Sequence, residues 1–208
     1  MKKASLALNR ILRFYRKKFR SEDYLFRGED KKFKEILCFC KVYAEYGCGK
    51  STIWVAKNTS AKIVSVDTSE TWIKKVSKTI GDEDKTSFLK FIDLGPIEGW
   101  GRPVGYSKAD DFCQYTDWIW KQKTLPDTVL IDGRFRVCCC LTSLKYAFAG
   151  TILIFDDYVN REKYHFVEKY LKPSEFFGQQ AFFIVPDKSK IDFTDIDADI
   201  IRFRNVMD

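Results

Sequence analysis

The chain has 208 residues and a net charge of +7, with 45% hydrophobic and 31% charged residues. These values are typical of one globular domain of ordinary size, and they exclude a disordered chain. The excess charge lies in residues 1–35, which hold twelve basic and five acidic side chains, whereas residues 36–208 hold 24 of each sign. A nucleic-acid-binding body is therefore disfavoured, and attraction to anionic partners is expected from the N-terminal segment.

Membrane-spanning and secreted proteins are also disfavoured. No stretch approaches the roughly 18 uncharged apolar residues that a membrane span needs. Arg10 and Arg13 interrupt what would be the apolar region of a signal peptide. The seven cysteines, three of them consecutive at 138–140, have no zinc-binding spacing and are expected to be reduced and mostly buried. We therefore expect a cytoplasmic protein.

The N-terminal segment is predicted to be separate from the rest of the chain. Residues 4–20 have helical spacing of apolar positions surrounded by basic side chains, and residues 21–34 form a polar linker or a second short helix. We divide the chain into a basic arm, residues 1–35, and one domain, residues 36–208. Residues 1–20 are a candidate for peripheral contact with an anionic membrane or for docking against the domain.

Beyond residue 35, apolar segments of strand length alternate with segments of helical spacing. Strands are expected at residues 36–44, 63–67, 88–92, 128–131, 151–155, 181–185 and 199–203. Helices are expected at residues 51–57, after Thr68 or Ser69, at 111–122, at 135–148 and around 161–171, and a long glycine-rich loop is expected at 94–110. This alternation predicts an α/β fold with a mostly parallel sheet and helices on both faces.

Acidic residues follow the expected strands. They are Glu45, Asp67, Asp93, Asp132, Asp156 and Asp157. Ligands of open α/β sheets bind outside the carboxyl ends of the strands. We therefore expect most of these carboxylates to line one site.

The glycine-rich segment after the first strand has two interpretations. Residues 44–51 fit a loose P-loop pattern, in which Lys50 would contact phosphates and Ser51 would hold magnesium. Glu45 is electrostatically awkward beside a polyphosphate, and this interpretation gives Asp67 no role.

The second interpretation is a site for an adenosine-type cofactor that carries an ammonium group and no phosphate. Gly47 and Gly49 would let the backbone pass close to the ligand, and Asp67 would accept hydrogen bonds from both ribose hydroxyls. Glu45 is then favourable, because the cofactor is cationic. The combination of these four residues is more specific than the glycines alone.

At these residues the sequence resembles class I S-adenosylmethionine-dependent methyltransferases. The resemblance covers about residues 36–205 and, within that superfamily, is greatest to a poorly characterised bacterial-type group. It is carried by residues 44–52 and 64–69, which are similar to motif I and the following acidic loop, and by residues 94–103, 131–137 and 155–158. Lys50 departs from the pattern, since many members have a small residue there.

The resemblance implies a Rossmann-like, seven-stranded, mostly parallel sheet whose last strand is antiparallel. It also implies methyl transfer from S-adenosylmethionine. In the resulting assignment Glu45 contacts the methionine end of the cofactor, Gly47 and Gly49 line its path, Asp67 holds the ribose and Asp93 meets the adenine edge.

Three carboxylates suggest a metal site. An Asp at position 132 and an Asp pair at 156 and 157 are similar to the pattern of metal-dependent small-molecule O-methyltransferases, which implies that Asp132, Asp156 and Asp157 bind Mg²⁺. Alternatively, Asp132 only fixes the loop and the cofactor while Asp156 caps a helix. Arg134 could pair with these carboxylates and replace a metal.

His165 is the only histidine and a candidate base for the acceptor hydroxyl, or a plain helix residue. With Asp132 and Arg134 it completes the expected catalytic set. The expected activity is methyl transfer, by O-methylation, to a small-molecule or glycan-like acceptor. The alternatives are a non-catalytic binding protein of the same fold and a P-loop nucleotide kinase or ATPase. The sequence does not indicate an oligomeric state.

Overall fold

The computed structural model describes residues 24–27, 29–81 and 87–208. The predicted helix at 4–20, and with it the predicted membrane contact, lies outside the described residues. The division of the chain at residue 35 stays a prediction. From residue 24 on, the described part of the N-terminal segment packs on the domain through Phe26 and Phe33, which are buried.

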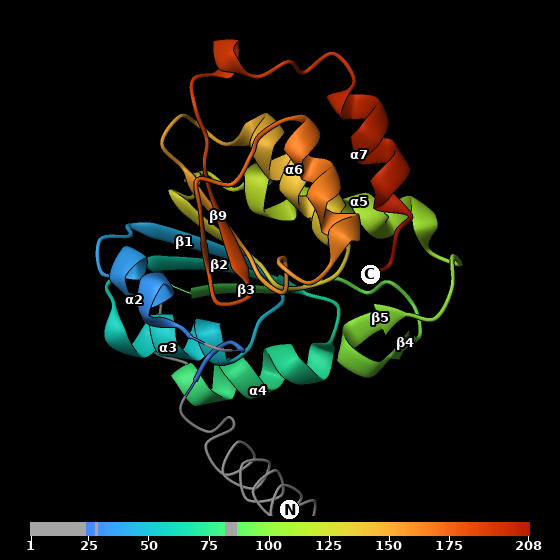
Figure 1. Cartoon of the computed structure of the whole chain (residues 1–208). Helices are drawn as coiled ribbons and strands as arrows, with labels where there is room; N and C mark the ends of the chain where they lie inside the picture. The colour runs from blue at the N-terminus through green and yellow to red at the C-terminus, as the bar shows by residue number, and fades with distance from the viewer. Residues whose placement is uncertain (1–23, 28, 82–86) are drawn as a thin grey trace, which may run out of the picture.

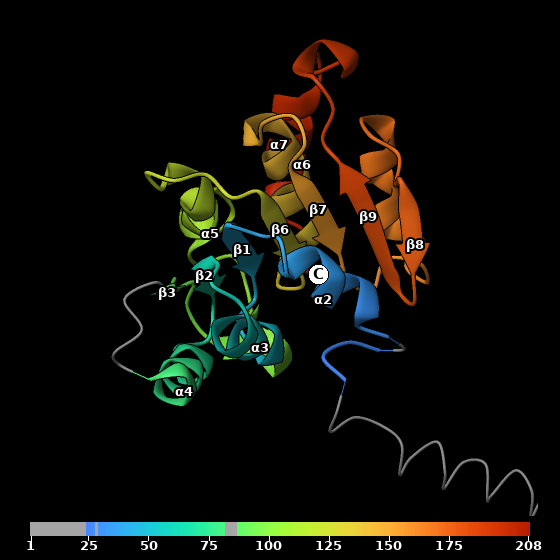
Figure 2. The ribbon, with the colours of Figure 1, turned by 90° about the vertical axis from the view of Figure 1, so that its left-hand side faces the viewer.

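A seven-stranded sheet forms the centre of the domain, in the order β3-β2-β1-β6-β7-β9-β8. Strands β3, β2, β1, β6 and β7 are parallel to one another, whereas β9 is antiparallel to β7 and to β8. Figure 2 shows this order across the sheet. The strands are β1 (Val42–Tyr46), β2 (Lys62–Asp67), β3 (Ser87–Phe91), β6 (Thr128–Ile131), β7 (Ile152–Phe155), β8 (Glu175–Phe177) and β9 (Gln180–Ile184).

Helices cover both faces of the sheet, as the alternating sequence pattern predicts. In Figure 1, α2, α3 and α4 lie on one side, and α5, α6 and α7 lie on the other. The helices are α2 (Lys31–Leu37), α3 (Lys50–Asn58), α4 (Glu70–Ile80), α5 (Phe112–Asp117), α6 (Arg136–Tyr146) and α7 (Ile196–Arg204). Short 3-10 segments are η1 (Gly99–Gly101), η2 (Ala109–Asp111), η3 (Trp118–Lys121), η4 (Glu162–Lys169) and η5 (Lys188–Lys190).

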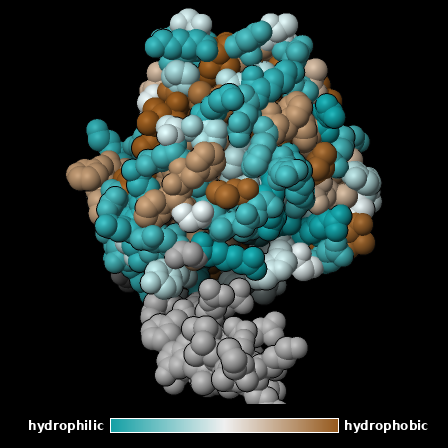
Figure 3. Space-filling model, viewed as in Figure 1, coloured by the Kyte–Doolittle hydropathy of each residue, from teal (hydrophilic) through white to brown (hydrophobic). Residues whose placement is uncertain are grey.

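Alternating side chains of the central strands pack into two separate hydrophobic cores, one on each face of the sheet. In β1, for example, Ala44 and Tyr46 join the core beneath α5, α6 and α7, whereas Tyr43 joins the core beneath α2 and α3. The strands are therefore buried on both faces, as near-continuous apolar runs require. On the face shown in Figure 3, apolar residues are interspersed with hydrophilic ones. Among the described residues, no helix combines the length and apolarity that a membrane span requires.

Two predicted strands differ from the structure. The expected strand at 36–44 begins only at Val42, because residues up to Leu37 complete α2. The expected strand at 199–203 belongs to α7, in which Ile196 and Ile200, four residues apart, face the core. The strand beside β9 is instead β8, a short edge strand with a mostly exposed pattern. The expectation that the last strand of the chain is antiparallel is confirmed. That strand is β9 at 180–184, and not residues 199–203.

The predicted loop at 94–110 contains a small hairpin. Its strands are β4 (Ile97–Glu98) and β5 (Arg102–Pro103), joined by η1. The hydroxyl of Thr68 donates to the carbonyl of Gly101 at 2.6 Å, so the hairpin lies against the segment that follows β2. Trp100 at its tip is 87% exposed.

Candidate functional site

The carboxyl ends of the three central strands are level with one another. Tyr46 at the end of β1 pairs with Ile131 at the end of β6, and Ile131 pairs with Phe155 at the end of β7. The loops that follow therefore leave one edge of the sheet side by side. Ligands of open α/β sheets bind at this edge.

The glycine loop after β1 touches the loop after β6. A Cβ atom on Gly47 would lie 2.8 Å from the Cα of Gly133, and a Cβ on Gly133 would lie 2.9 Å from the Gly47 nitrogen. Gly47 also has a φ of +92°, which side chains other than glycine rarely adopt. A Cβ on Gly49, by contrast, would meet no atom within 4 Å. The loop thus needs glycine at position 47 for packing, whereas Gly49 borders open space.

Glu45 is fully buried beneath this loop. Its carboxylate accepts hydrogen bonds from the hydroxyls of Tyr43 (2.7 Å), Ser51 (2.8 Å), Ser65 (3.0 Å) and Thr52. Burial raises the pKa of Glu45, and the four hydroxyl donors oppose that shift. Glu45 therefore ties β1, β2 and the start of α3 together from inside the protein, and its side chain is not exposed to the space above the loop.

Asp67, at the end of β2, holds the glycine loop in place. One carboxylate oxygen accepts the backbone N–H of Cys48 at 2.9 Å, and the other accepts the N–H of Ser69 at 2.6 Å. The residue is 9% exposed, and burial raises its pKa against these two donors. These two hydrogen bonds use one of the two lone pairs on each carboxylate oxygen, and the Cys48 thiol and the Thr68 N–H also interact with this carboxylate.

Asp93, in contrast, is engaged with the hairpin loop. Its carboxylate accepts the N–H of Gly95 at 2.9 Å and pairs with the ammonium group of Lys108. The Lys108 contact lowers the pKa of Asp93. Within the described chain, no hydrogen bond joins Asp93 to the glycine loop or to Asp67, so it lies beside the other predicted residues without contacting them.

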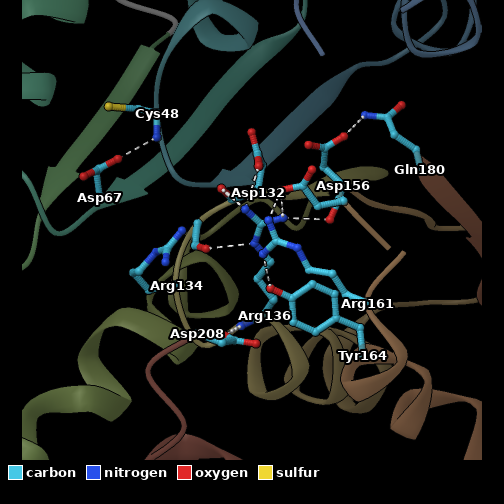
Figure 4. A network of polar contacts seen from close by, with 12 residues as sticks. Cys48, Asp67, Asp132, Arg134, Arg136, Asp156, Arg161, Tyr164, Gln180 and Asp208 are labelled. Carbon is cyan, nitrogen blue, oxygen red and sulfur yellow. Dashed lines mark hydrogen bonds and ion pairs between the residues drawn. The ribbon is translucent and has the colours of Figure 1, made fainter. Parts of the chain in front are cut away.

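Arg136 lies at the centre of the other carboxylates (Figure 4). It is only 4% exposed. Its Nε donates to the carbonyl of Gly133 at 3.0 Å, Nη1 donates to the carbonyl of Asp156 at 2.7 Å, and Nη2 donates to the carbonyl of Asp132 at 3.2 Å. Nη2 also lies 3.0 Å from the Asp132 carboxylate, and Nη1 lies 3.5 Å from that of Asp157. One guanidinium therefore joins the loop after β6 to the loop after β7.

The charges within this cluster shift one another's pKa. Burial acts to lower the pKa of Arg136, but Asp132 and the other anionic neighbours outweigh it, and the net shift is upward. Burial raises the pKa of Asp132 although Arg136 opposes the shift, and burial together with Asp132 raises the pKa of Asp156. Arg136 is therefore always charged, and Asp132, whose side chain is 34% exposed, is the accessible carboxylate of the cluster.

These carboxylates do not fit a magnesium site in this arrangement. The Arg136 guanidinium lies between Asp132 and Asp157, and the Asp156 carboxylate accepts from the side-chain amide of Gln180 at 2.9 Å. Across the described ranges, no group of three His, Cys, Asp or Glu side chains is placed to hold a metal ion. A cation is indeed present between the carboxylates, but it is a side chain of the protein.

Arg134 and His165 lie outside the Arg136 cluster. Figure 4 shows the Arg134 side chain between the Asp67 side and the Asp132 side of the site. Its Nε is buried without a hydrogen-bond partner in the described chain. The ring of His165 stacks on Tyr158, and its Nε2 lies 3.3 Å from the Tyr158 carbonyl. No hydrogen bond or ion pair in the described structure joins His165 to Asp132, Asp156 or Asp157.

Sequence reasoning missed Arg136 and its supports. The residue lies four positions after Asp132 in the first turn of an otherwise mostly apolar helix, and this placement of a lone arginine was the available signal. Tyr164 lies beneath its guanidinium, with 5.8 Å from Cζ to the ring centre. Asp208 accepts the backbone N–H of Arg136 at 2.9 Å, a contact between segments 72 residues apart that no local pattern indicates.

No protein-family model matches the sequence, and no curated protein sequence matches it. The structure is similar to that of a methyltransferase-like protein from Silicibacter pomeroyi, with a TM-score of 0.76 and 27% sequence identity. That match covers 88% of this chain and 97% of the other.

A second match is more distant. The N-methyltransferase NodS from Bradyrhizobium japonicum, in complex with S-adenosyl-L-homocysteine, aligns with a TM-score of 0.51 and 14% identity over 81% of this chain and 92% of its own. The seven strands and the antiparallel β9 agree with the sheet that the sequence resemblance implies. The chain therefore has the class I S-adenosylmethionine-dependent methyltransferase fold.

Proposed function

We propose that this protein transfers a methyl group from S-adenosylmethionine to a hydroxyl group of a small-molecule or glycan-like acceptor. The observation that supports this most directly is the pairing of Asp67 with the backbone N–H of Cys48. It places a carboxylate that can accept ribose hydroxyls beside a glycine loop that a ligand can approach at Gly49. The chemistry of these residues fits the ribose of a nucleoside.

Each residue of the site has a role in this proposal. Asp67 and the Gly47–Gly49 loop hold the cofactor, and Glu45 acts from beneath by fixing the strands and the start of α3. The cofactor supplies an electrophilic methyl group. Asp132 accepts the proton of the acceptor hydroxyl, and its raised pKa suits a base because it brings proton affinity closer to neutral pH. Arg136 is a positioning residue that fixes the Asp132 carboxylate.

The nucleotide-kinase alternative is disfavoured by the position of Ser51. Its hydroxyl donates to the buried Glu45 carboxylate at 2.8 Å and is itself buried, so it is directed away from any ligand above the loop. A P-loop would need this hydroxyl on magnesium. The non-catalytic alternative differs only in turnover, since a fold does not by itself establish an activity.

A methylation assay tests the proposal. The protein is incubated with S-adenosylmethionine and a panel of hydroxyl-bearing acceptors, and formation of S-adenosylhomocysteine is measured. We expect acceptor-dependent product with the unchanged protein and loss of product with Asp132→Asn. Cofactor binding without methylation of any acceptor class would favour the non-catalytic alternative, and absence of cofactor binding would overturn the proposal.

A further inference from the structure

A polar cavity of about 290 Å³ adjoins the Arg136 cluster. It is lined by Arg27, Asp157, Asn160, Arg161 and Gln179. All five side chains are polar, whereas pockets for drug-like ligands are lined predominantly by apolar groups. The volume is near the lower end of the ~300–1,000 Å³ typical of small-molecule sites, which suits one sugar ring or a similar group.

Asp157 connects this cavity to the proposed site of methyl transfer. Its φ of +57° is unusual for a residue other than glycine. Its carboxylate lies 2.7 Å from Nη2 of Arg161 on the cavity side and 3.5 Å from Nη1 of Arg136 on the other. Arg136 in turn contacts Asp132. Contacts from Arg161 through Asp157 and Arg136 therefore connect the cavity wall to Asp132.

The amide groups of the cavity are suited to hydroxyl groups. Nδ2 of Asn160 donates to Oε1 of Gln179 at 2.6 Å. This bond leaves the Asn160 carbonyl oxygen and the Gln179 amide N–H groups for a ligand. A paired acceptor and donor on one wall can bind neighbouring hydroxyls, each of which both donates and accepts.

The charges of the cavity favour an anion. The Asp157 carboxylate is already paired with Arg161 and lies near Arg136. Arg161 also donates to the hydroxyl of Tyr164 at 2.9 Å. Arg27 comes from the segment before α2, far in sequence from the other lining residues. It makes no hydrogen bond or ion pair with any part of the chain that the structure describes. Its positive charge is therefore the one on the cavity wall that a ligand would balance.

We propose that this cavity binds the acceptor and selects a hydroxyl-rich molecule that carries an anionic group, either a carboxylate or a phosphate. This inference rests on the proposed methyl transfer and specifies its substrate class. Arg27 binds the anionic group, and Asn160 and Gln179 bind hydroxyls. The acceptor hydroxyl that is methylated is the one that reaches past Asp157 towards Asp132.

Calorimetric titration of the full chain tests the proposal, with D-glucuronate, D-glucose 6-phosphate and D-glucose as probes. Each probe is titrated with and without S-adenosylhomocysteine. We expect at least one of the two anionic sugars to bind about tenfold more tightly than glucose, because hydrogen bonds to charged groups are the stronger ones. The preferred anion distinguishes a carboxylate from a phosphate acceptor.

Two variants and a control locate the binding. Arg27→Gln should remove the preference for the anionic sugars, and Asn160→Ala should weaken all three probes. Lys78→Gln removes an equal charge from the exposed side of α4. It should change neither the preference for anionic sugars nor the affinity for any probe. Equal binding of glucose and both anions, an unchanged preference in Arg27→Gln, or binding of no probe would each overturn the proposal. S-adenosylhomocysteine binding, measured in the same titrations, reports on the methyltransferase assignment separately.

Discussion

Nη2 of Arg136 lies 3.0 Å from the carboxylate of Asp132, and the same guanidinium donates to backbone carbonyls of the loops after β6 and β7. Arg136 is buried, whereas the Asp132 side chain is 34% exposed, so solvent screens part of this ion pair. The ion pair and the backbone hydrogen bonds together fix the structure of the sheet edge and the direction of the Asp132 carboxylate.

Asp132→Asn should lower kcat by about 10²–10⁴-fold, because the amide cannot accept the proton of the acceptor hydroxyl. Affinity for S-adenosylhomocysteine, measured by calorimetry, should change little. Since the pKa of Asp132 is raised, kcat/KM of the unchanged protein should increase with pH through a value above the ordinary ~3.9 of aspartate. Asp110→Asn, an exposed carboxylate on η2, is the control. Equal activity of Asp132→Asn and the control would show that another group is the base.

Chelation of divalent metals should leave methyl transfer unchanged. Arg136 lies between Asp132 and Asp157, where a magnesium ion would have to bind, and it supplies the positive charge. The measurement is the initial rate in EDTA and in added magnesium chloride. A rate that falls in EDTA and recovers with magnesium would mean that the cluster rearranges to admit a metal.

Asp156→Asn should stabilise the protein at alkaline pH. Burial raises the folded-state pKa of Asp156, so the folded protein is penalised as the pH rises from the unfolded pKa to the folded one. Asparagine retains Oδ1 as the acceptor for Gln180 and carries no charge. The gain in Tm over the unchanged protein should therefore be larger near pH 9 than near pH 5. A gain that shrinks with rising pH would contradict the assigned shift.

Gly133→Ala should reduce the stability of the protein, whereas Gly49→Ala should reduce its affinity for the cofactor. A Cβ on Gly133 would lie 2.8 Å from the carbonyl carbon of Tyr46 and closer still to the Tyr115 hydroxyl, so we expect a loss of about 1–3 kcal/mol or more in stability. A Cβ on Gly49 would meet nothing within 4 Å, and stability should be unchanged. Cofactor affinity should nevertheless fall in Gly49→Ala, because that space borders the proposed ligand. Chemical denaturation and calorimetry separate the two effects, and unchanged affinity in Gly49→Ala would place the cofactor elsewhere.

Much of the fold could be predicted because its signals are local. Strands β2, β6 and β7 are short apolar runs that end at an aspartate or just before one, and this pattern is visible in the sequence. Helix α7 was misread because residues 199–203 contain Ile200, Ile201 and Phe203 in a run that also fits a strand. Burial of Ile196 with Ile200, which identifies the helix, depends on packing against α6.

The carboxylates of the site could be predicted from the sequence, but the position of the Arg136 guanidinium among them could not. The acidic residues after β2, β6 and β7 are read directly from strand ends. The partner of Asp132 depends on how α6 leaves its strand: Phe135 adopts a left-handed φ of +55°, and the helix begins at Arg136. This turn brings Arg136, and not Arg134, between the two loops. The positions of His165 and Glu45 likewise depend on which face of an element is turned inward.

Calorimetric titration of S-adenosylmethionine into the full chain tests whether the protein binds this cofactor at Asp67, with Asp67→Ala and Lys78→Gln as matched variants. We expect one binding site per chain with micromolar affinity, which corresponds to about −8 kcal/mol. Asp67→Ala should weaken binding by at least about tenfold, because it removes the ribose acceptor and releases the Cys48 N–H, while Lys78→Gln should match the unchanged protein. Absence of binding at millimolar cofactor, or equal binding by Asp67→Ala, would contradict this expectation.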